Sequence, residues 1–525
     1  LGRAVEDEVY LYGTEQDLMG ENVFCTSLAG EEIGRMRSWG KHPLSRAEHL
    51  LSSPTHMNDC PQTYMEPVLF KTACSRGTQA RMSTEYLRHE QDADGVTTTC
   101  LDRLTGKEIT IRSKYMVGAD GGNSKVAEHA GLEFEGKMGV GGSMNILFKA
   151  DLSKYVAHRP SVLYWVLQPG SNVGGIGMGL VRMIRPWNEW LIVWGYDING
   201  PEPEGDEAFA KKVARDLVGD PDLDVEIPSV STWTVNNMYA TTLSSGRVFC
   251  MGDAIHRHPP SNGLGSNTSI QDAFNLAWKL AMVIRGQAGT RLLDSYQVER
   301  APIAKQIVTR ANKSIEEFGP IFKGLGLLDS IDPVKMQQNM DARCDDTGDA
   351  EAQRTAIREA IAFKVYEFDA HGVEMNQRYR SDAVVTDGQA EPPFQKDAEL
   401  HYQPTTWPGA RLPHVWVFGP NGEKVSTLDL AGHGRFSILT GIGGNSWNEA
   451  ARTVGEELGI DIAVQTIGPR QQWEDYAGDW ARARETRDSG AVLVRPDHHV
   501  AWRSETISDD PAAELRRVLT SILDR

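Results

Sequence analysis

Hydrophobic residues lie in short runs and in helical spacing along the chain, and polar stretches separate them, which predicts a folded protein of many elements. β-branched and apolar residues from Ile109 to Asp120 predict a strand that leads into a glycine turn, and a short helix follows at 124–132. Two aromatic-rich runs, SVLYWVLQPG and EWLIVWGYD, predict strands within residues 140–242. This region holds five of the thirteen tryptophans, which favours a sheet with one aromatic face, although each tryptophan can equally be an ordinary core residue.

The second half of the chain alternates strand and helix patterns around a polar break. A short apolar strand at 246–254 ends in Gly-Asp, and helical patterns follow at 269–285 and over most of 295–380. A proline-rich linker is predicted at 385–410, with an α/β unit after it. In that unit we expect strands at 414–418, 435–440, 461–467, 491–495 and 500–503, and helices at 446–458 and 511–523. The expected organisation is one domain in two parts, a sheet domain, the linker and a C-terminal domain, at 1–139 with 243–384, 140–242, 385–410 and 411–525.

The charge balance narrows the choice of partners. The chain has 54 Lys and Arg against 72 Asp and Glu, a net charge of −18, so no nucleic acid and no anionic membrane is expected as a partner. No run of ~18 apolar residues predicts a transmembrane helix, and no signal peptide opens the chain. The six cysteines are scattered without a CxxC pair, so neither a metal site nor a disulfide framework is predicted. We expect reduced thiols in a cytoplasmic enzyme.

The strongest chemical signal is the stretch GDAIHRHPPSNGLGSN at 252–267. Its strand ends at a carboxylate, Asp253, which is suited to accept hydrogen bonds from a sugar or ribityl hydroxyl. A proline pair then stiffens the chain, and a Gly-x-Gly turn lets the backbone approach a ligand closely. The next helix aims its N-terminal N–H groups at whatever lies in front, which suits an electron-rich ring or an anion. Together these features predict a flavin site; the alternative is a strand, a glycine turn and a capped helix that need no ligand.

This stretch closely resembles the GD motif of the FAD-dependent aromatic hydroxylases, the single-component group A flavin monooxygenases. The resemblance implies that Asp253 hydrogen-bonds the ribityl chain of FAD and that Pro259 or Pro260 lies against the isoalloxazine ring. It also implies that the turn and the helix start place backbone donors at the pyrimidine edge, where they stabilise negative charge on the reduced flavin. The cofactor-binding residues expected in this motif are Gly252, Asp253, Pro259, Pro260, Gly263, Gly265, Ser266 and Asn267.

A second stretch, GADGGNSKVA at 118–127, resembles the DG motif of the same family, which serves both FAD and NAD(P)H. This arrangement of a strand end, a glycine turn and a helix start is suited to bind a pyrophosphate, so Asp120 is expected to bind cofactor. The family has an arginine where this chain has Ala127, and Lys125 is the nearest substitute. Gln62 begins QTYMEPVLFKTA, in which the family places a Gln or Arg against FAD; an exposed helix start is an equal alternative.

The family opens with a βαβ unit that carries G-x-G-x-x-G, and no such pattern occurs in these 525 residues. The first residues, LGRAVEDEVYLYGTEQDLMGEN, resemble family sequence from well inside the flavin domain. We therefore expect a three-layer FAD-binding domain that lacks its first βαβ unit, with a gap beside the strand that ends at Asp120. Such a domain is expected to bind FAD poorly.

The resemblance covers nearly the whole chain. Residues 142–199 resemble the substrate-binding sheet of the phenol hydroxylases, and LPHVWVFG, GRFSILTGIGG and VLVRPDHHVAWR resemble their thioredoxin-like domain. A working thioredoxin has CxxC where this chain has GIGGN at 441–445, so we expect a redox-silent C-terminal domain that serves assembly, in a homodimer. The expected fold class is α/β, as an α+β multidomain chain with FAD-binding, β-sheet and thioredoxin-like domains.

The resemblance implies a monooxygenase that uses FAD, NAD(P)H and O2 to hydroxylate a phenol-like or chlorophenol-like substrate ortho to its oxygen. Phenolate is the better nucleophile, so a group beside the substrate oxygen should favour ionisation. His256 and Pro260 are the catalytic candidates, and His258, His56 and Asp59 are further candidates for the base; a structural histidine is an equal explanation. Two other interpretations stay open, a flavin-deficient fragment or pseudoenzyme that keeps its dimerisation domain, and a flavoprotein reductase.

Overall fold

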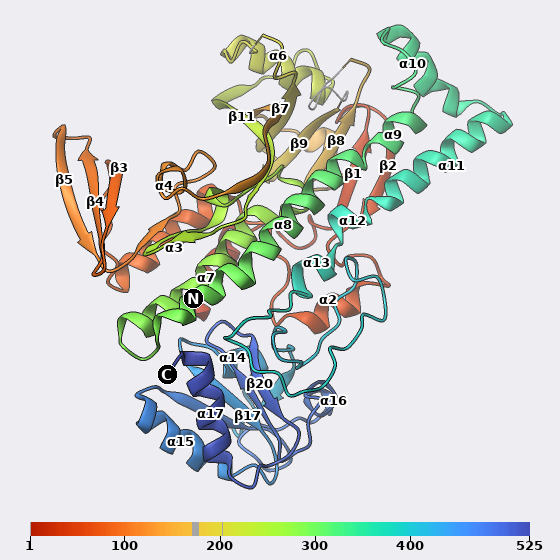
Figure 1. Ribbon diagram of the computed structural model, residues 1–525. Helices are drawn as coiled ribbons and strands as arrows, with labels where there is room; N and C mark the ends of the chain where they lie inside the picture. The colour runs from red at the N-terminus through yellow and green to blue at the C-terminus, as the bar shows by residue number, and fades with distance from the viewer. Residues whose placement is uncertain (1, 171–177, 202) are drawn as a thin grey trace.

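The computed structural model describes residues 2–170, 178–201 and 203–525. Figure 1 shows a large sheet at the top, long helices beneath it and a separate α/β unit at the bottom. Strands from distant parts of the sequence share the large sheet, because red, orange and yellow-green segments lie in it together (Figure 1). The mixed α/β multidomain class predicted from the sequence is confirmed.

In the part of the chain that the structure describes, the large sheet has eight strands in the order β14-β11-β7-β10-β9-β8-β1-β2, and β1 and β8 are the only parallel pair. The two aromatic runs of the sequence form β8 and β10, as predicted. In sheet order the strands are β14 (His256–Arg257), β11 (Glu226–Ala240), β7 (Phe134–Lys149), β10 (Glu189–Tyr196), β9 (Met178–Arg185), β8 (Leu163–Leu167), β1 (Glu21–Cys25) and β2 (Glu32–Arg37).

The two faces of this sheet differ in burial. On one face Trp190, Ile192 and their neighbours form a closed core beneath helices α5 (Ser153–Val156) and α6 (Glu207–Val218). The other face is largely half-buried and presents two cross-strand rows, Trp165–Leu180–Val193–Asn145 and Leu163–Arg182–Leu191–Leu147. Tryptophans therefore occur on both faces, and the expectation of a single aromatic face is wrong. Consecutive side chains of a strand point to opposite faces, and the tryptophans stand at positions of both kinds.

A smaller sheet leads into the glycine turns of the two motifs, at 118–127 and 252–267. Its strands are β6 (Met116–Gly118), β13 (Val248–Cys250) and β12 (Ser244–Ser245), with β6 and β13 parallel. The predicted strand at 109–120 is split between sheets, because β5 (Lys107–Ser113) pairs with β4 (Val96–Asp102), and β4 with β3 (Thr84–Gln91), in a ribbon that projects from the body (Figure 1). Within the described ranges no strand pairs with the other edge of β6, where Val117 is 37% exposed.

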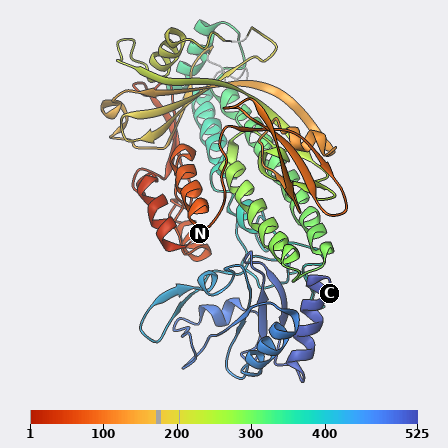
Figure 2. The same ribbon diagram turned by 90° about the vertical axis from the view of Figure 1, so that its left-hand side faces the viewer.

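Two long helices, α7 (Leu264–Ile284) and α8 (Asp294–Glu316), pack together beneath the large sheet (Figures 1 and 2). Next along the chain, α9 and the segment before it place Phe318 and Phe322 in a core with Trp165 of the sheet. The remaining helices of the upper part are α1 (Arg3–Tyr12), α2 (Arg46–Ser52), α3 (Gln62–Ser75), α4 (Lys125–His129), α9 (Gly319–Gly324), α10 (Pro333–Asp341), α11 (Gly348–Phe363), α12 (Val365–Phe368) and α13 (His371–Met375).

The C-terminal unit is built on a four-stranded sheet in the order β18-β17-β19-β20. Its helices α15 and α17 coincide with the predicted helices, and five of its strands, β15, β17, β18, β19 and β20, lie within a residue or two of the predicted ones; β16 was not predicted. The elements are β15 (Trp416–Phe418), β16 (Lys424–Ser426), α14 (Thr427–Leu430), β17 (Phe436–Thr440), α15 (Ser446–Leu458), β18 (Ile462–Thr466), α16 (Asp479–Ala483), β19 (Ala491–Val494), β20 (Val500–Ser504) and α17 (Pro511–Leu523).

The C-terminal unit shares a hydrophobic core with α7. Trp278 and Met282 of α7 belong to the same buried cluster as Phe436, and the rings of Trp278 and Phe436 meet edge to face with centroids 5.8 Å apart. The segment 385–410 is irregular, and Tyr402 and Trp407 within it are buried; its role as a linker stays a prediction. The C-terminal unit is therefore fixed against the helix that starts at the glycine turn.

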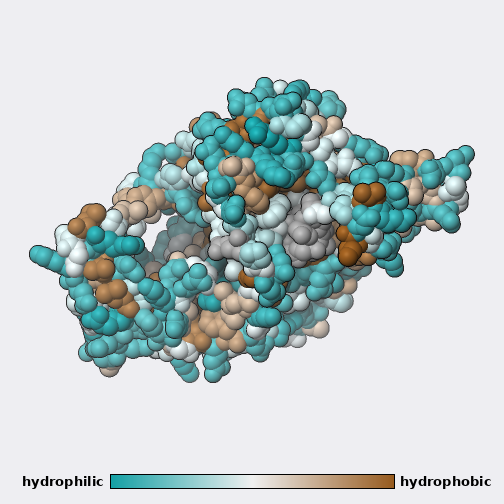
Figure 3. Space-filling view, turned by 90° about the horizontal axis from the view of Figure 1, so that it is seen from above, coloured by the Kyte–Doolittle hydropathy of each residue, from teal (hydrophilic) through white to brown (hydrophobic). Residues whose placement is uncertain are grey.

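The face of the molecule seen from above is mostly hydrophilic, with small hydrophobic patches (Figure 3). Several of the exposed apolar residues belong to the β3–β5 ribbon and to the α9–α11 region; they are Met82, Leu104, Ile111, Leu328, Ile331, Val334 and Phe363. Among the described residues, no helix combines the length and the hydrophobicity needed to cross a bilayer, and no group of His, Cys, Asp and Glu is arranged to hold a metal ion.

A buried histidine should make the fold sensitive to acid. His371 of α13 is 4% exposed, with its ring nitrogens 3.2 Å from Glu48 and 3.0 Å from the hydroxyl of Ser52. Burial, and then the neighbouring His49, lower the pKa of His371 from 6.5 to about 4. Because the pKa of His371 is lower in the folded protein than in the unfolded chain, protonation favours the unfolded chain. The free energy of unfolding therefore keeps its full value above pH 6.5 and decreases as the pH falls towards 4. The loss is about 3 kcal/mol.

We expect unfolding midpoints of His371→Gln to depend less steeply on pH between 7 and 4 than those of the wild type. Thermal unfolding in a pH series measures this, with the exposed His158→Gln as the control, which should keep the wild-type slope. A slope unchanged in His371→Gln would show that this imidazole does not contribute.

Candidate functional site

The turn after β13 presents a carboxylate to the surface. Gly252 takes a positive φ of 66°, which turns the chain sharply after the buried strand. Asp253 follows and is exposed; its backbone oxygen accepts a hydrogen bond from Arg257, but its carboxylate has no hydrogen-bond partner among the described residues. A strand-end carboxylate with both oxygens free is suited to accept hydrogen bonds from ligand hydroxyls.

The start of α7 leaves its backbone donors free. Gly263 precedes the helix in a left-handed conformation, and no side chain of the described residues caps the first turn. A Cβ placed on Gly263 would meet no atom within 4 Å, and one on Gly265 only the ring of His258, at 3.7 Å. Ser266 and Asn267 of this turn are also exposed. Uncapped N–H groups at a helix N-terminus facing open space fit an electron-rich or anionic group, so this turn and Asp253 together fit a flavin.

The two prolines lie between these elements. Pro259 is buried and Pro260 is exposed at the surface of the turn. The carbonyl of Pro260 accepts a hydrogen bond from the N–H of Gly263 at 3.1 Å, which fixes the approach to the helix. Pro260 is therefore placed to contact a ligand, and its catalytic role stays a prediction.

His256 and His258 lie behind the turn. His256 is fully buried and its Nε2 is 2.9 Å from Oδ2 of Asp272, which also accepts the N–H of Gly252 at 3.1 Å. His258 Nδ1 is 2.6 Å from the carbonyl of Pro259, and its buried Nε2 has no hydrogen-bond partner in the described chain. Burial lowers the pKa of His258 to about 4, so this imidazole is neutral at pH 7. The contacts of His256 are those of a residue that holds the turn in place, and its predicted catalytic role has no contact to support it.

The DG stretch forms a turn that holds itself together. Asp120 accepts hydrogen bonds from the hydroxyl of Ser124 and from the N–H of Val126, the latter at 3.1 Å. Ser124 caps α4 by accepting from the N–H of Ala127 at 2.9 Å. A Cβ placed on Gly121 would meet no atom within 4 Å, so the turn leaves room for a phosphate. Asp120 itself is engaged by its own turn, and its cofactor role stays a prediction.

Gln62 lies at the first position of α3 and is exposed. Its amide donates to Glu66 one helical turn on, and within the described ranges no hydrogen bond joins its side chain to the 252–267 stretch. Its predicted contact with a cofactor stays a prediction.

The pair Asp59 and Arg182 had little support from the sequence. Arg182 stands in the middle of β9 on the half-buried face of the large sheet, and its guanidinium donates to Oδ1 of Asp59, in the loop before α3. The other oxygen of Asp59 and Nε of Arg182 are buried without a hydrogen-bond partner in the described structure. Buried polar atoms of this kind call for a ligand or water. The available signal was a charged residue at the centre of an apolar strand, MGLVRMIR.

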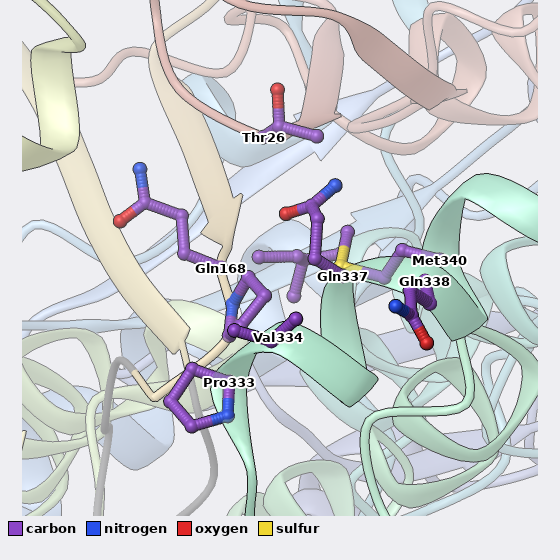
Figure 4. Close-up of a pocket in the computed structure, with 9 residues that line it drawn as sticks. Thr26, Gln168, Pro333, Val334, Gln337, Gln338 and Met340 are labelled. Carbon is purple, nitrogen blue, oxygen red and sulfur yellow. The ribbon is translucent and has the colours of Figure 1, made fainter.

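A hollow of about 610 Å³ opens elsewhere, between the end of β8 and α10 (Figure 4). None of the described residues that line it has an ionisable side chain; they are Thr26, Leu167, Gln168, Pro169, Pro333, Val334, Gln337, Gln338 and Met340. None of the predicted site residues is among these lining residues.

Two known protein families match this chain, one over its N-terminal part and one over its C-terminal part. The model of an FAD binding domain matches residues 2–311, and that of an aromatic-ring hydroxylase C-terminal domain matches residues 405–525. The first match alone spans more than half of the chain.

Individual relatives agree with these matches. The chain is 55% identical over 522 residues to 2,4-dichlorophenol 6-monooxygenase of Cupriavidus pinatubonensis, covering 99% of this chain and 87% of that protein. It is 50% identical over 518 residues to phenol 2-monooxygenase of a Pseudomonas species, covering 98% and 83%. Among solved structures, the flavin-dependent monooxygenase PieE with FAD and substrate superposes with a TM-score of 0.94 at 40% identity, covering 99% and 89%. Aklavinone-11 hydroxylase with FAD and aklavinone gives 0.77 at 27% identity, with the same coverage.

Proposed function

Since this chain belongs to the FAD-dependent aromatic-ring hydroxylases, we propose that it hydroxylates a phenolic ring ortho to the phenol oxygen, with NAD(P)H and O2 as co-substrates. The protein is an FAD-dependent aromatic monooxygenase. A chlorinated or unsubstituted phenol is the proposed substrate class, by analogy with the two relatives named for such substrates. The observation that carries the proposal is the free carboxylate of Asp253 beside an uncapped helix start.

The residues at this turn are proposed to hold FAD in two ways. The carboxylate of Asp253 would accept hydrogen bonds from the ribityl hydroxyls, and the first-turn N–H groups of α7, from Gly265 to Asn267, would donate to the flavin ring. Bound FAD, once reduced by NAD(P)H, supplies the oxygen-activating chemistry that no side chain can supply. The turn at Gly121 and Gly122 leaves space for the pyrophosphate.

The pair Asp59 and Arg182 is proposed to receive the substrate oxygen. The unpartnered oxygen of Asp59 can accept the phenol proton, and the guanidinium of Arg182 stabilises the resulting phenolate. Phenolate is more electron-rich at its ortho carbon than phenol, so this transfer prepares the ring for attack. On the same sheet face, the half-buried Leu191 and Val193 offer apolar contact to the ring.

The test is to add FAD, NADH or NADPH and a phenol to the purified chain and to measure oxygen uptake and the catechol product. Coupled uptake and catechol support the proposal. NAD(P)H oxidation without a hydroxylated product would favour the reductase, and no flavin binding at all would favour the pseudoenzyme.

We expect Asp253→Ala to bind FAD about 10- to 100-fold more weakly while the chain stays folded. A hydrogen bond to a charged group contributes about 1.5–3 kcal/mol, and every 1.4 kcal/mol is a factor of ten. Fluorescence titration with FAD measures the change. Asp509→Ala is the control, because Asp509 is exposed in the C-terminal unit and should leave affinity unchanged. Equal affinity in both variants would remove Asp253 from the site.

A cytoplasmic location and a homodimer are also proposed. All six cysteines are free, and burial raises the pKa of Cys25 and of Cys250 to about 12, so these two thiols are protonated and unreactive. Such thiols fit a reducing compartment. Sedimentation equilibrium tests the dimer.

A further inference from the structure

A buried series of charges joins the C-terminal unit to the turn that carries Asp253. It consists of six ionisable side chains, three positive and three negative, none more than 2% exposed; we call it the buried charge chain, formed by Lys279, Arg300, Arg495, Asp272, Glu299 and Asp497. The three positive and three negative charges balance within the buried charge chain. The mechanism proposed above uses none of these six groups.

One end of the buried charge chain lies in the C-terminal unit. Arg495, in the turn after β19, donates from both terminal nitrogens to the two carboxylate oxygens of Glu299 on α8, at 2.5 and 2.9 Å. Arg495 is held in turn by Asp497, at 3.0 and 2.6 Å. A two-point contact between guanidinium and carboxylate fixes orientation as well as distance. The C-terminal unit therefore determines where this part of α8 lies.

The next residue of α8, Arg300, links this contact to the Gly252–Asp253 turn. Consecutive residues on a helix point about 100° apart, so Arg300 reaches α7 at a different place from Glu299, which contacts Asn275 and Lys279 of that helix. Its Nε donates to Oδ1 of Asp272 at 2.7 Å. The other oxygen of Asp272 accepts from the N–H of Gly252 at 3.1 Å. Gly252 directly precedes Asp253, so the direction of the Asp253 carboxylate depends on this hydrogen bond.

A second contact leads from the C-terminal unit to the same arginine. The ring of His499 stacks on that of Tyr379, with centroids 4.2 Å apart. The hydroxyl of Tyr379 accepts a hydrogen bond from Nη1 of Arg300 at 3.0 Å. The guanidinium of Arg495 lies 5.3 Å from the centroid of the Tyr379 ring. Arg300 is thus held from the C-terminal side by two routes.

We propose that Arg495 is a positioning residue for the flavin site, acting through Glu299, Arg300 and Asp272 on the Gly252–Asp253 turn. The C-terminal unit is then part of the flavin-binding apparatus as well as part of the fold. Without Arg495 the turn is free to adopt other orientations, and FAD binds less tightly. This inference rests on the flavin site proposed above.

The experiment compares two buried arginines of the C-terminal unit. Arg495→Met breaks the buried charge chain. Arg503→Met is the matched control, because Arg503 is also buried but pairs with Asp387 and Glu485, outside α7 and α8. The unfolding midpoint and the FAD dissociation constant are measured for each, the latter well below the midpoint. Both variants should unfold more easily, but only Arg495→Met should bind FAD weakly, by about tenfold.

A second variant keeps the test decisive if Arg495→Met does not fold. Arg495→Lys preserves the charge but loses the two-point contact, and it should lower FAD affinity by a smaller factor than Arg495→Met. Wild-type affinity in the folded Arg495 variants would overturn the inference, and so would an equal loss in Arg503→Met, which would indicate a general effect of stability. A wild-type chain that bound no FAD would instead contradict the flavin site itself.

Discussion

Replacing Asp59 by Asn should lower the rate of substrate hydroxylation about 100-fold or more, with little change in FAD binding. Asn keeps the shape of the side chain and can still contact Arg182, but it cannot take a proton from the phenol. A positioned general base contributes a factor of about 10²–10⁴. The rate of product formation under single-turnover conditions, with saturating phenol, measures this effect free of product release.

The control for this experiment is Asp17→Asn, which removes a carboxylate from another loop of the N-terminal region. It should hydroxylate phenol at the wild-type rate. Raising the pH should partly rescue Asp59→Asn, because phenolate then forms in solution without a base. A wild-type rate in Asp59→Asn at neutral pH would remove Asp59 from the chemistry and leave Arg182 as a purely electrostatic group.

Replacing Lys279 by Met should lower the free energy of unfolding by about 3–5 kcal/mol. Lys279 is fully buried, and its ammonium donates to Glu299 at 2.8 Å and to Asn275 at 2.7 Å. Met fills nearly the same volume, so the loss comes from leaving an uncompensated negative charge in the interior rather than from a cavity. The midpoint of urea unfolding, followed by tryptophan fluorescence, measures the change.

Lys137→Met is the control for this variant, because Lys137 is exposed on β7. Its midpoint should stay within the experimental error of the wild type. If Lys279→Met were as stable as the wild type, water or a shifted side chain would have to compensate Glu299, and the buried charge chain would matter less than its geometry indicates.

The regular elements were predictable wherever local signals and tertiary packing agree. Helix α17 begins at Pro511, a favoured first position, and Asp510 caps it, so both signals could be read from the sequence. Helix α7 starts five residues before its predicted start, because Gly263 caps it in a left-handed conformation that no side-chain pattern announces. The strand predicted at 109–120 divides at Lys114 and Tyr115, since only pairing partners decide which sheet a strand joins.

The site was predictable to the extent that its residues are neighbours in sequence. The turn at 252–267 brings Asp253 and the helix start together within one motif, and the family and the FAD cofactor predicted from it are confirmed. The pair Asp59 and Arg182 is 123 residues apart and forms only when the loop before α3 meets β9. The partnership of His256 with Asp272 likewise depends on how α7 packs, which a single sequence does not reveal.

The core that Trp278 and Phe436 share has a consequence for how such enzymes can be recombined. A terminal domain joined by a loose tether can be exchanged between relatives like a cassette, because neither part packs against the other. Here a crossover in residues 385–410 would pair one parent's α7 with another parent's β17, and the two rings that meet edge to face would come from different proteins. Functional chimeras of this family should therefore take α7 and the C-terminal unit from the same parent, or carry matched changes in both.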